Sequence, residues 1–372
     1  MKVILAMFLV TLSLPALGAV INPDGSGDYP TIQSALGDLP TGSNITLSPG
    51  VFTGAGNWDL SFFGKHFNFY GGTGDPADVI FDLNEGPGRD THRVIVLDDL
   101  GEAGCYFRYI TFRGGRAPGA NGGAVFAEGV WVDFVDCIFE DNQADQGGAI
   151  YGYQSEVYLT RCHFELNIAN RGGALFGAGN NNFNLYLCRC ENNHANDRGG
   201  VAASAAVSSG SISFSNSVCW QNTATLYAGV AYLADATQGF FDYNTFVENF
   251  APLASSLFLS SSFYLDNNII AWGNSSPVQG TGGGVTVFCN DIYGNTGGDY
   301  LGPLTGYLGT DSNISQDPQF CGITDGYLAL QSDSPCAPDH SPCSSEPIGA
   351  LPVECGEQAT LLMHWDAVKS LY

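Results

Sequence analysis

A phrase of about 25 residues recurs through the middle of this chain, and this repeat constrains the fold more than any other feature. A short apolar run that ends in asparagine returns at Asn142, Asn167 and Asn193 and continues less regularly as far as Asn295. A second phrase, Gly-Gly followed by apolar residues, follows several of these anchors, as at residues 147–150. The blade of a β-propeller needs roughly 40 residues or more, so the repeat length excludes that architecture.

Each repeat holds two or three short β-rich runs that are separated by Gly, Asn and Asp. No helical period of 3.6 residues passes through them. A unit this small cannot bury its own apolar face, so successive units must stack on one another. The pattern therefore predicts an all-β parallel solenoid, in which strands of successive coils pair about 4.8 Å apart.

Composition excludes one class of function. Only 13% of the 372 residues are charged, and 49 glycines, with many Asn and Ser, supply the polarity of the turns. Acidic residues outnumber basic ones by 37 to 12, which gives a net charge of −25. A protein without a basic footprint does not bind nucleic acid through its phosphates, nor anionic lipid by charge. We therefore exclude a nucleic-acid partner.

The first 19 residues predict a signal peptide. Lys2 supplies the positive charge, an apolar run follows, and Leu17, Gly18 and Ala19 form a cleavage site of the small-residue type. The apolar run is shorter than the roughly 20 residues of a membrane-spanning helix. We expect an exported mature chain that begins near Val20 and has no transmembrane segment.

The repeat phrases resemble those of a known family. Phe-x-x-Asn at residues 139–142 and Gly-Gly-Ala-Ile at residues 147–150 are similar to the repeats of chlamydial polymorphic outer-membrane proteins. More broadly, the chain resembles the right-handed parallel β-helix proteins of the pectin-lyase-like superfamily. Residues 24–36 are similar to the start of pectin methylesterases, where a short helix caps the solenoid, and Ile32, Leu36 and Leu39 would form its apolar stripe.

The resemblance implies a right-handed parallel β-helix over residues 20–320, with a short N-terminal capping helix. It also implies a bacterial protein that is secreted or held at the cell surface. The catalytic phrases of pectin methylesterases and polygalacturonases are absent from the sequence. The resemblance therefore predicts the fold and supplies no matching catalytic set.

The cysteines form two groups. Cys137, Cys162 and Cys188 recur with the repeat, and we expect them to be small apolar residues of the core, with disulfides between coils as the alternative. Residues 321–355 resemble the closing segment of exported bacterial β-helix proteins and carry four cysteines, for which three pairings are possible. We predict Cys336–Cys343 and Cys321–Cys355, because nested loops would pin the last coil shut. Residues 356–372 are expected to be a short tail, either a cap or a sorting element, unless the chain is truncated there.

Alternation along each repeat predicts which side chains reach the surface. Val135, Cys137 and Phe139 are expected to face inward, with Thr160 and Tyr186 stacked behind Val135. The outward positions then form columns across the coils, and one column holds Glu140, Glu165 and Glu191 about 5 Å apart. Like charges at that separation raise one another's pKa unless a cation or an arginine intervenes.

This acidic column has two interpretations, a solvated wall of salt bridges or a site with an acid, a base and an aromatic platform. The candidate catalytic residues are Glu140, Glu165, Glu191, His163 and Arg161. The candidate ligand-binding residues are Trp220, Arg189, Asp145, Arg171, Asp197 and Arg198, the last four of them in the turns before Gly-Gly. Calcium is a possible cofactor, because it prefers such oxygen ligands, whereas no histidine spacing predicts a metal site of the zinc type.

The sequence as a whole favours an exported, monomeric and non-catalytic module that binds glycans or another cell-surface ligand in an adhesin-like or structural role. The alternative is a polysaccharide lyase or glycoside hydrolase that uses the acidic column. Two carboxylates about 5 Å apart match the geometry of a retaining hydrolase. A chain of net charge −25 repels polyuronates unless calcium bridges the contact, so neutral glycans are the preferred ligand class.

Overall fold

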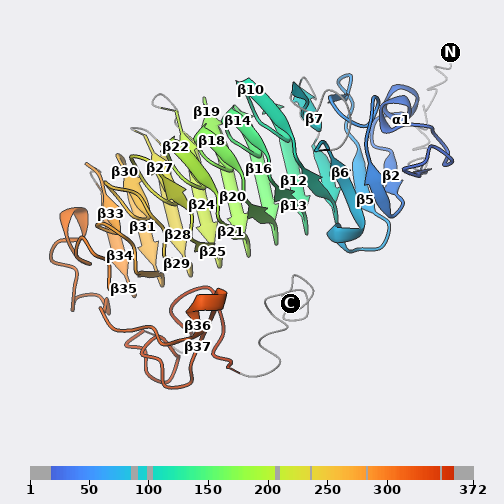
Figure 1. Cartoon of the computed structure of the whole chain (residues 1–372). Helices are drawn as coiled ribbons and strands as arrows, with labels where there is room; N and C mark the ends of the chain where they lie inside the picture. The colour runs from blue at the N-terminus through green and yellow to red at the C-terminus, as the bar shows by residue number, and fades with distance from the viewer. Residues whose placement is uncertain are drawn as a thin grey trace, which may run out of the picture.

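The computed structural model describes residues 18–84, 91–98, 104–205, 210–234, 237–281, 284–343 and 346–355. These residues form a right-handed parallel β-helix, whose coils follow one another along a single axis (Figure 1). Strands at equivalent places in successive coils pair in parallel and build four sheets, which we call A, B, C and D. The predicted fold class is confirmed.

The strands are distributed over the sheets as follows. Sheet A holds β1 (Gly18–Ile21), β2 (Asn44–Leu47), β5 (Asn68–Gly71), β8 (Cys105–Arg108), β12 (Trp131–Val135), β16 (Glu156–Thr160), β20 (Asn182–Tyr186), β24 (Ser211–Ser215), β28 (Gln238–Asp242), β31 (Phe263–Asp266) and β34 (Val285–Phe288). Sheet B holds β3 (Gly50–Phe52), β6 (Val79–Asp82), β9 (Thr111–Arg113), β13 (Ile138–Glu140), β17 (His163–Glu165), β21 (Arg189–Glu191), β25 (Val218–Trp220), β29 (Thr245–Val247), β32 (Ile269–Ala271) and β35 (Asp291–Tyr293). Sheet C holds β4 (Leu60–Ser61), β7 (Ile95–Asp98), β11 (Val125–Glu128), β15 (Ile150–Tyr153), β19 (Leu175–Ala178), β23 (Ala202–Ser204), β27 (Ala231–Leu233), β30 (Leu257–Leu259) and β33 (Val278–Gln279). Sheet D holds β10 (Arg116–Asn121), β14 (Gln143–Gln146), β18 (Ile168–Arg171), β22 (His194–Arg198) and β26 (Thr223–Ala224).

The turn from sheet A to sheet B is made by one residue with positive φ. Asp136 has a φ of 53° and Arg161 a φ of 50°, values in the left-handed region that few residues other than glycine adopt. This turn restarts the alternation of side chains, so that Phe134 and Cys137 both face the core. The prediction that Val135, Thr160 and Tyr186 face inward is therefore wrong, and these three residues lie on the outer face of sheet A.

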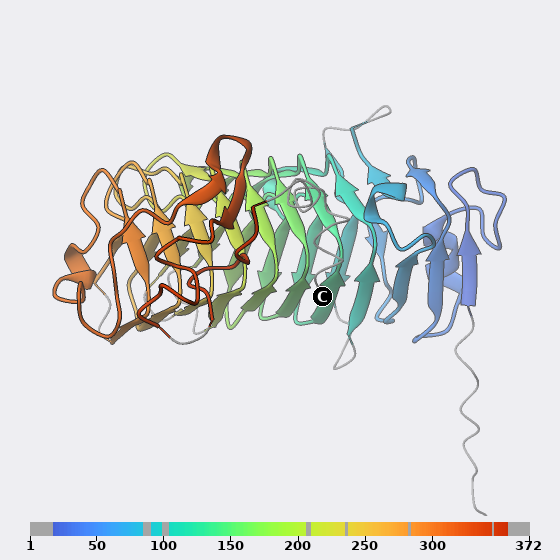
Figure 2. The same ribbon diagram turned by 90° about the horizontal axis from the view of Figure 1, so that it is seen from below.

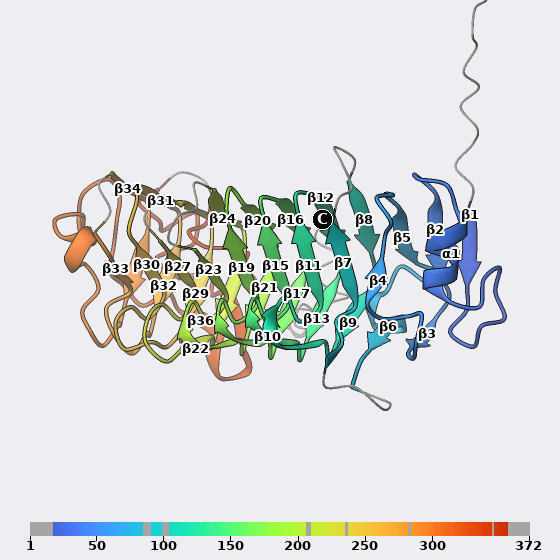
Figure 3. The ribbon, with the colours of Figure 1, turned by 90° about the horizontal axis from the view of Figure 1, so that it is seen from above.

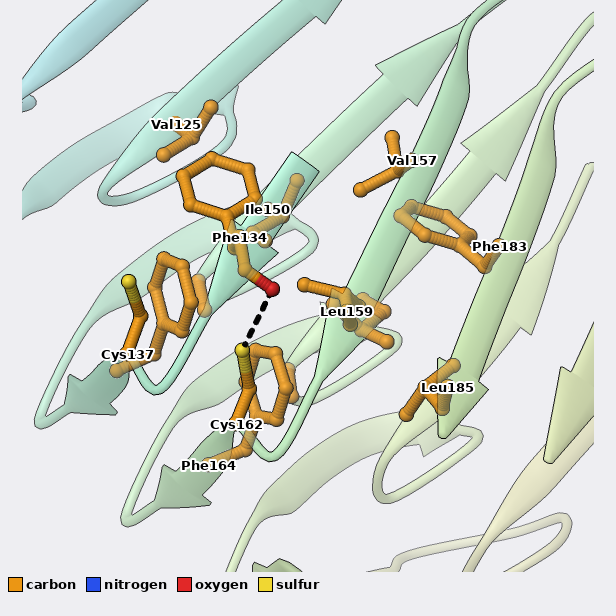
Figure 4. Close-up of a cluster of buried hydrophobic side chains, with 14 of the residues drawn as sticks. Val125, Phe134, Cys137, Ile150, Val157, Leu159, Cys162, Phe164, Phe183 and Leu185 are labelled. Atoms are coloured by element: carbon orange, nitrogen blue, oxygen red, sulfur yellow. Dashed lines mark hydrogen bonds between the residues drawn. The ribbon is translucent and has the colours of Figure 1, made fainter. Parts of the chain in front are cut away.

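A continuous column of buried polar side chains follows this turn. Its members are Cys137, Cys162, Cys188, Ser217, Asn244, Asn268, Asn290 and Asn313. Each reaches a backbone carbonyl: Cys162 Sγ lies 3.3 Å from Phe134 O (Figure 4), and Asn244 Nδ2 donates to Phe214 O at 2.8 Å. The three repeat cysteines are free thiols in the core, as predicted, and burial raises the pKa of Cys137.

The turn from sheet B to sheet D carries an asparagine ladder. Its members Asn142, Asn167, Asn193, Asn222 and Asn249 are the anchors of the sequence repeat, and all are buried. Asn167 Nδ2 donates to Phe139 O and to Asn193 Oδ1, both at 2.9 Å, and Asn167 Oδ1 accepts from the backbone of Asn142. Each of the first four amides thus ties three coils together, and Asn249 ends the ladder with bonds to the preceding coil, which explains why asparagine recurs at this place.

The interior is filled by side chains stacked in the same way. The rings of Phe112, Phe139 and Phe164 follow one another with centroids 4.9 Å apart in both steps. Glycine is required where the coils approach most closely, because a Cβ on Gly148 would lie 2.1 Å from the carbonyl oxygen of Gly173. The Gly-Gly phrase of the repeat marks this close contact.

The N-terminal end carries the expected helix, α1 (Ile32–Asp38) (Figure 3). Thr31 caps it by accepting from the backbone of Ser34, and its predicted stripe of Ile32, Leu36 and Leu39 is buried in the main core. Gly18 and Ala19 already belong to β1, and residues 1–17 of the predicted signal peptide lie outside the described residues. Within the described part of the chain, no helix is long and apolar enough to cross a membrane.

Residues 315–355, which we call the C-terminal segment, add no further coil. They run back along the outside of the solenoid (Figure 2) and include the antiparallel pair β36 (Phe320–Gly322) and β37 (Tyr327–Leu330). Leu328 and Ile348 pack with Val247 and Ile269 of sheet B. The segment therefore covers the outer face of sheet B over its last strands.

The disulfides of the C-terminal segment are predicted in part. Cys321 pairs with Cys355, as expected. The pair Cys336–Cys343 is wrong, because Cys343 is bonded to Cys289 of the solenoid and Cys336 is a buried free thiol. The segment folds onto the solenoid instead of closing on itself, so its cysteine reaches a partner in the repeat region. The predicted tail, residues 356–372, lies outside the described residues.

Candidate functional site

Sheet B brings the predicted acidic column together. In the register of β13, β17 and β21, Glu140 pairs with Glu165 and Glu165 with Glu191, and His163 lies beside Arg189. Arg113 precedes Glu140 in the same column and Trp220 follows Glu191. The repeat positions these side chains, since the three glutamates lie two residues before a ladder asparagine and His163 and Arg189 lie four residues before one.

The side chains of His163, Glu165 and Glu191 converge, with one ligand atom from each lying within 4.8 Å of the others. His163 Nε2 lies 2.8 Å from Glu191 Oε1. Arg189 Nη2 lies 2.7 Å from the other carboxylate oxygen of Glu191. Glu191 is therefore held from both sides by cationic or donor groups.

The two glutamates have divergent pKa values. Burial by itself would raise the pKa of Glu191, but the hydrogen bond from His163 and the charge of Arg189 outweigh it and lower the pKa to about 2. The pKa of Glu165 is raised, mainly by burial and further by the charges of Glu191 and Glu140, against the opposing effect of His163 and Arg189. A carboxylate kept ionised next to one that gains a proton readily is the arrangement that acid–base catalysis uses.

The same group could hold a cation. Imidazole and carboxylate oxygens suit zinc-like metals, whereas calcium takes six to eight oxygen ligands. Both oxygens of Glu191 already contact His163 or Arg189. A metal ion between His163 and Glu191 would have to break their hydrogen bond, so the donor set fits a structural ion-pair network better than a metal site.

Arg161 does not join this cluster. It forms a bidentate pair with Asp136, with distances of 2.9 Å from Nε to Oδ1 and 2.8 Å from Nη2 to Oδ2. Both residues lie at the turn from sheet A to sheet B, one above the other in consecutive coils. The pair fastens neighbouring coils and leaves Arg161 away from the glutamates.

Trp220 is held between other groups. Its Nε1 donates to Glu248 Oε2 at 3.1 Å, and the guanidinium of Arg189 lies 5.8 Å from the ring centroid. A Cβ on Gly326 of the C-terminal segment would lie 2.5 Å from the indole. The ring anchors the C-terminal segment on sheet B, so it is no open platform for a sugar.

The predicted turn cluster forms only in part. Asp197 Oδ2 accepts from Arg198 Nε at 2.8 Å and from Arg171 Nε at 3.3 Å. Asp145 accepts from Asn170 instead. Arg198 also lies over the ring of Tyr232, 4.7 Å from its centroid. The arginines are engaged with residues of this chain.

A hollow with a volume of about 470 Å³ lies elsewhere, on sheet A. Its outward-facing residues come from β28, β31 and β34, and they are Phe240, Asp242, Tyr264, Asp266, Thr286 and Phe288. The rings of Phe240 and Tyr264 stack with centroids 5.3 Å apart and planes 6° from parallel. Tyr264 is 48% exposed and Phe288 46%. Both side chains are therefore accessible from solvent, although Phe240 and Tyr264 cover one face of each other.

Two carboxylates adjoin the rings. Asp242 and Asp266 are paired in register on β28 and β31. Burial raises the pKa of both, and the charge of Asp242 raises that of Asp266 further. Ser215 donates to Asp242 at 2.8 Å and Asn267 to Asp266 at 2.9 Å, so each carboxylate is fixed in place. The hollow thus combines an aromatic floor with oriented hydrogen-bond acceptors.

Sequence reasoning missed this hollow, although a signal for it exists. The signal is a constant spacing from the buried column of Cys and Asn side chains that follows the turn from sheet A to sheet B. Four residues lie four positions before a member of that column and therefore share one row on sheet A, and they are Asp133, Tyr158, Phe240 and Tyr264. The same uninterrupted alternation that placed Val135 and Thr160 inside would place this row inside as well. The residue with positive φ reverses that assignment.

The fold and the strand register define the molecule as a right-handed parallel β-helix with polar columns on its outer faces. Residues 136–153 match the family model described as a Chlamydia polymorphic membrane protein repeat. No curated protein matches the chain. Among solved structures, the chain is similar to the crystal structure of pectate lyase Pel9A, at 14% identity and a TM-score of 0.37, over 92% of this chain and 98% of that one.

Proposed function

We propose that this protein is a secreted or cell-surface β-helix that binds neutral glycans without transforming them. The hollow on sheet A carries this proposal. Aromatic rings stack on the C–H face of a pyranose, and carboxylates that are already oriented accept hydrogen bonds from sugar hydroxyls. Such a combination of an apolar floor with a few fixed polar groups is typical of small-ligand sites.

The charge of the molecule favours a neutral ligand. With a net charge of −25, and with Asp242 and Asp266 inside the hollow, the protein repels uronates and sulfated sugars. The predicted signal peptide and the match to a Chlamydia polymorphic membrane protein repeat support a location outside the cytoplasm. The contacts proposed in the hollow involve no metal ion. Calcium is still a predicted cofactor, so the binding assay is run with and without it.

A glycan array, followed by calorimetry on the retained sugars, tests this function with and without calcium. Tyr264→Leu removes the stacking face and is expected to weaken binding about tenfold, the loss that one aromatic contact accounts for. Phe250→Ala, at an exposed aromatic residue on another face, is the matched control and should bind like the wild type. Equal retention by Tyr264→Leu and wild type would place the ligand elsewhere.

One observation favours a second function, a glycoside hydrolase or polysaccharide lyase on sheet B. The opposite pKa shifts of Glu165 and Glu191 provide a proton donor beside an ionised carboxylate. Release of reducing or unsaturated ends from a retained glycan, abolished by Glu165→Gln, would establish this activity. Retention without product, unchanged by Glu165→Gln, would leave binding as the function.

A further inference from the structure

The hollow belongs to a longer row on the outer face of sheet A. Register places eight residues in this row, one from each consecutive strand, and they are Tyr106, Asp133, Tyr158, Asn184, Ser213, Phe240, Tyr264 and Thr286. Aromatic residues lie near both ends of the row and small polar ones in the middle. The row runs along the axis of the solenoid, since neighbouring members come from successive coils (Figure 3).

A second aromatic cluster lies at the N-terminal end of this row. Trp131, beside the row on β12, has its ring 4.9 Å from that of Tyr106 and 5.7 Å from that of Tyr158, measured between centroids. The indole lies over Gly104, where a Cβ would come within 1.7 Å of it. Glycine at this position lets the indole lie close against the sheet.

This second cluster also has its own carboxylates. Asp133 lies between Tyr106 and Tyr158 in the row, and Glu156 pairs with Trp131 in the neighbouring row. Tyr158 donates to Glu156 Oε2 at 3.3 Å. The cluster therefore repeats the combination of aromatic rings and hydrogen-bond acceptors found in the hollow.

The strip between the two clusters is lined by small polar side chains. Asn184 and Ser213 fill the row, and Ser211 donates to Asn182 beside them at 2.9 Å. Three strand steps separate Tyr158 from Phe240, which is about 14 Å at the spacing of a parallel sheet. Small polar side chains leave room for a ligand to lie across them and offer hydrogen bonds to it.

We propose that the outer face of sheet A is one extended binding site for a linear neutral oligosaccharide, which lies along the solenoid axis and contacts both aromatic clusters. This inference rests on the proposed glycan-binding function and adds the shape and length of the ligand. A short sugar occupies the hollow at Tyr264 alone. A chain long enough to span the strip reaches Trp131 as well and gains affinity, because its second contact is made without a second loss of translational freedom.

Calorimetry with cello-, xylo- and manno-oligosaccharides of two to six units tests this inference on the full-length mature protein. In the series that binds, we expect the hexamer to bind at least about tenfold more tightly than the dimer. Trp131→Leu should remove that gain and leave dimer binding unchanged, whereas Tyr264→Leu should weaken both. Tyr158→Leu serves as a second variant should Trp131→Leu fold poorly, and Phe250→Ala is the control.

The possible failures are distinct. Affinity that does not rise with chain length, while the dimer binds through Tyr264, overturns the extended site and leaves the glycan-binding function standing. A rise that persists in both Trp131→Leu and Tyr158→Leu places the additional contact elsewhere and also overturns it. Failure of all three series to bind overturns the extended site, and the glycan-binding function is overturned with it when the array retains no neutral glycan either.

Discussion

Single buried amides decide how firmly one coil holds the next. Asn167 donates two hydrogen bonds from its amide nitrogen and accepts two at its oxygen, from the backbone and the side chain of Asn142. All of these partners are buried, so that none can turn to water instead. A ladder of this kind stabilises the folded state more per residue than hydrogen bonds at the surface do, because every lost partner leaves an unsatisfied group in the core.

Asn167→Ala is therefore expected to lower the free energy of unfolding by about 3 kcal/mol, since it leaves several buried donors and acceptors without partners. Urea-induced unfolding followed by circular dichroism measures the effect. Asn170→Ala, three residues further along and exposed, is the control and should stay within about 0.5 kcal/mol of the wild type. Similar losses in the two variants would contradict the importance of the ladder.

The buried position just after the turn from sheet A to sheet B is occupied by cysteine in some coils and by asparagine in others. Cys137, Cys162 and Cys188 occupy the place that Asn244, Asn268 and Asn290 take in later coils, and both residue types reach a backbone carbonyl. Their burial in the core was predictable from the repeat. Their equivalence to the later asparagines was not, because the sequence phrase blurs between the coils at Cys188 and Asn244.

Among the elements, the C-terminal segment is held by hydrogen bonds to a buried carboxyl group of β35, that of Asp291. Burial raises the pKa of Asp291 to about 7, and the charges of Asp299 and Asp317 act in the same direction. Hydrogen bonds from Cys336 and from the backbone of Gln316 oppose this rise without cancelling it. Asp291 thus stays protonated in the folded protein at pH values where it is ionised in the unfolded chain.

We expect Asp291 to make stability fall as the pH rises. Its contribution is complete below the ordinary pKa of 3.8 and is lost as the pH rises to about 7, because the folded state alone retains the proton in that interval. Relative to Asp291→Asn, the wild type should lose on the order of 3 kcal/mol between pH 5 and pH 8. Asparagine keeps an acceptor for Gln316 and has no charge to bury.

Unfolding in urea at several pH values measures this difference, and subtracting the variant's curve removes the effect of the other titrating groups. Asp333→Asn, which removes an exposed carboxyl of the same segment, is a control and should retain the wild-type dependence on pH. A constant difference between the wild type and Asp291→Asn from pH 5 to pH 8 would contradict the raised pKa.

Sequence reasoning succeeded for elements that repeat and failed for those that do not. The acidic column on sheet B was placed correctly because Glu140, Glu165 and Glu191 keep a fixed distance from the asparagine ladder. The path of the C-terminal segment over Val247 and Ile269 could not be predicted. It depends on contacts between two surfaces of different sequence, and such contacts produce no periodic pattern along the chain. The bond from Cys343 to Cys289 was missed for the same reason.

At the scale of the whole molecule, charge opposes folding. With 37 acidic and 12 basic residues, most carboxylates have no cationic partner and repel one another. Compact packing brings these charges closer together than they are in the unfolded chain. The described ion pairs, such as Arg113–Asp82 and Arg116–Asp141, relieve only part of this repulsion.

Salt should therefore stabilise the protein. Raising NaCl from about 10 mM to about 1 M shortens the screening length from about 30 Å to about 3 Å and should raise Tm by several degrees. Differential scanning calorimetry gives the shift, and KCl at equal ionic strength serves to separate screening from effects specific to sodium. A Tm that falls as salt is added would mean that attractive pairs dominate the electrostatics of the fold.

The stacking of coils has a final consequence for the two aromatic clusters on sheet A. Their separation is counted in whole coils, so it changes only in increments of about 4.8 Å. Duplication or loss of one repeat between Tyr158 and Phe240 would move the clusters apart or together by one increment while every ladder kept its alignment. If the proposed glycan site is correct, the number of repeats between the clusters sets the length of the oligosaccharide that can contact both.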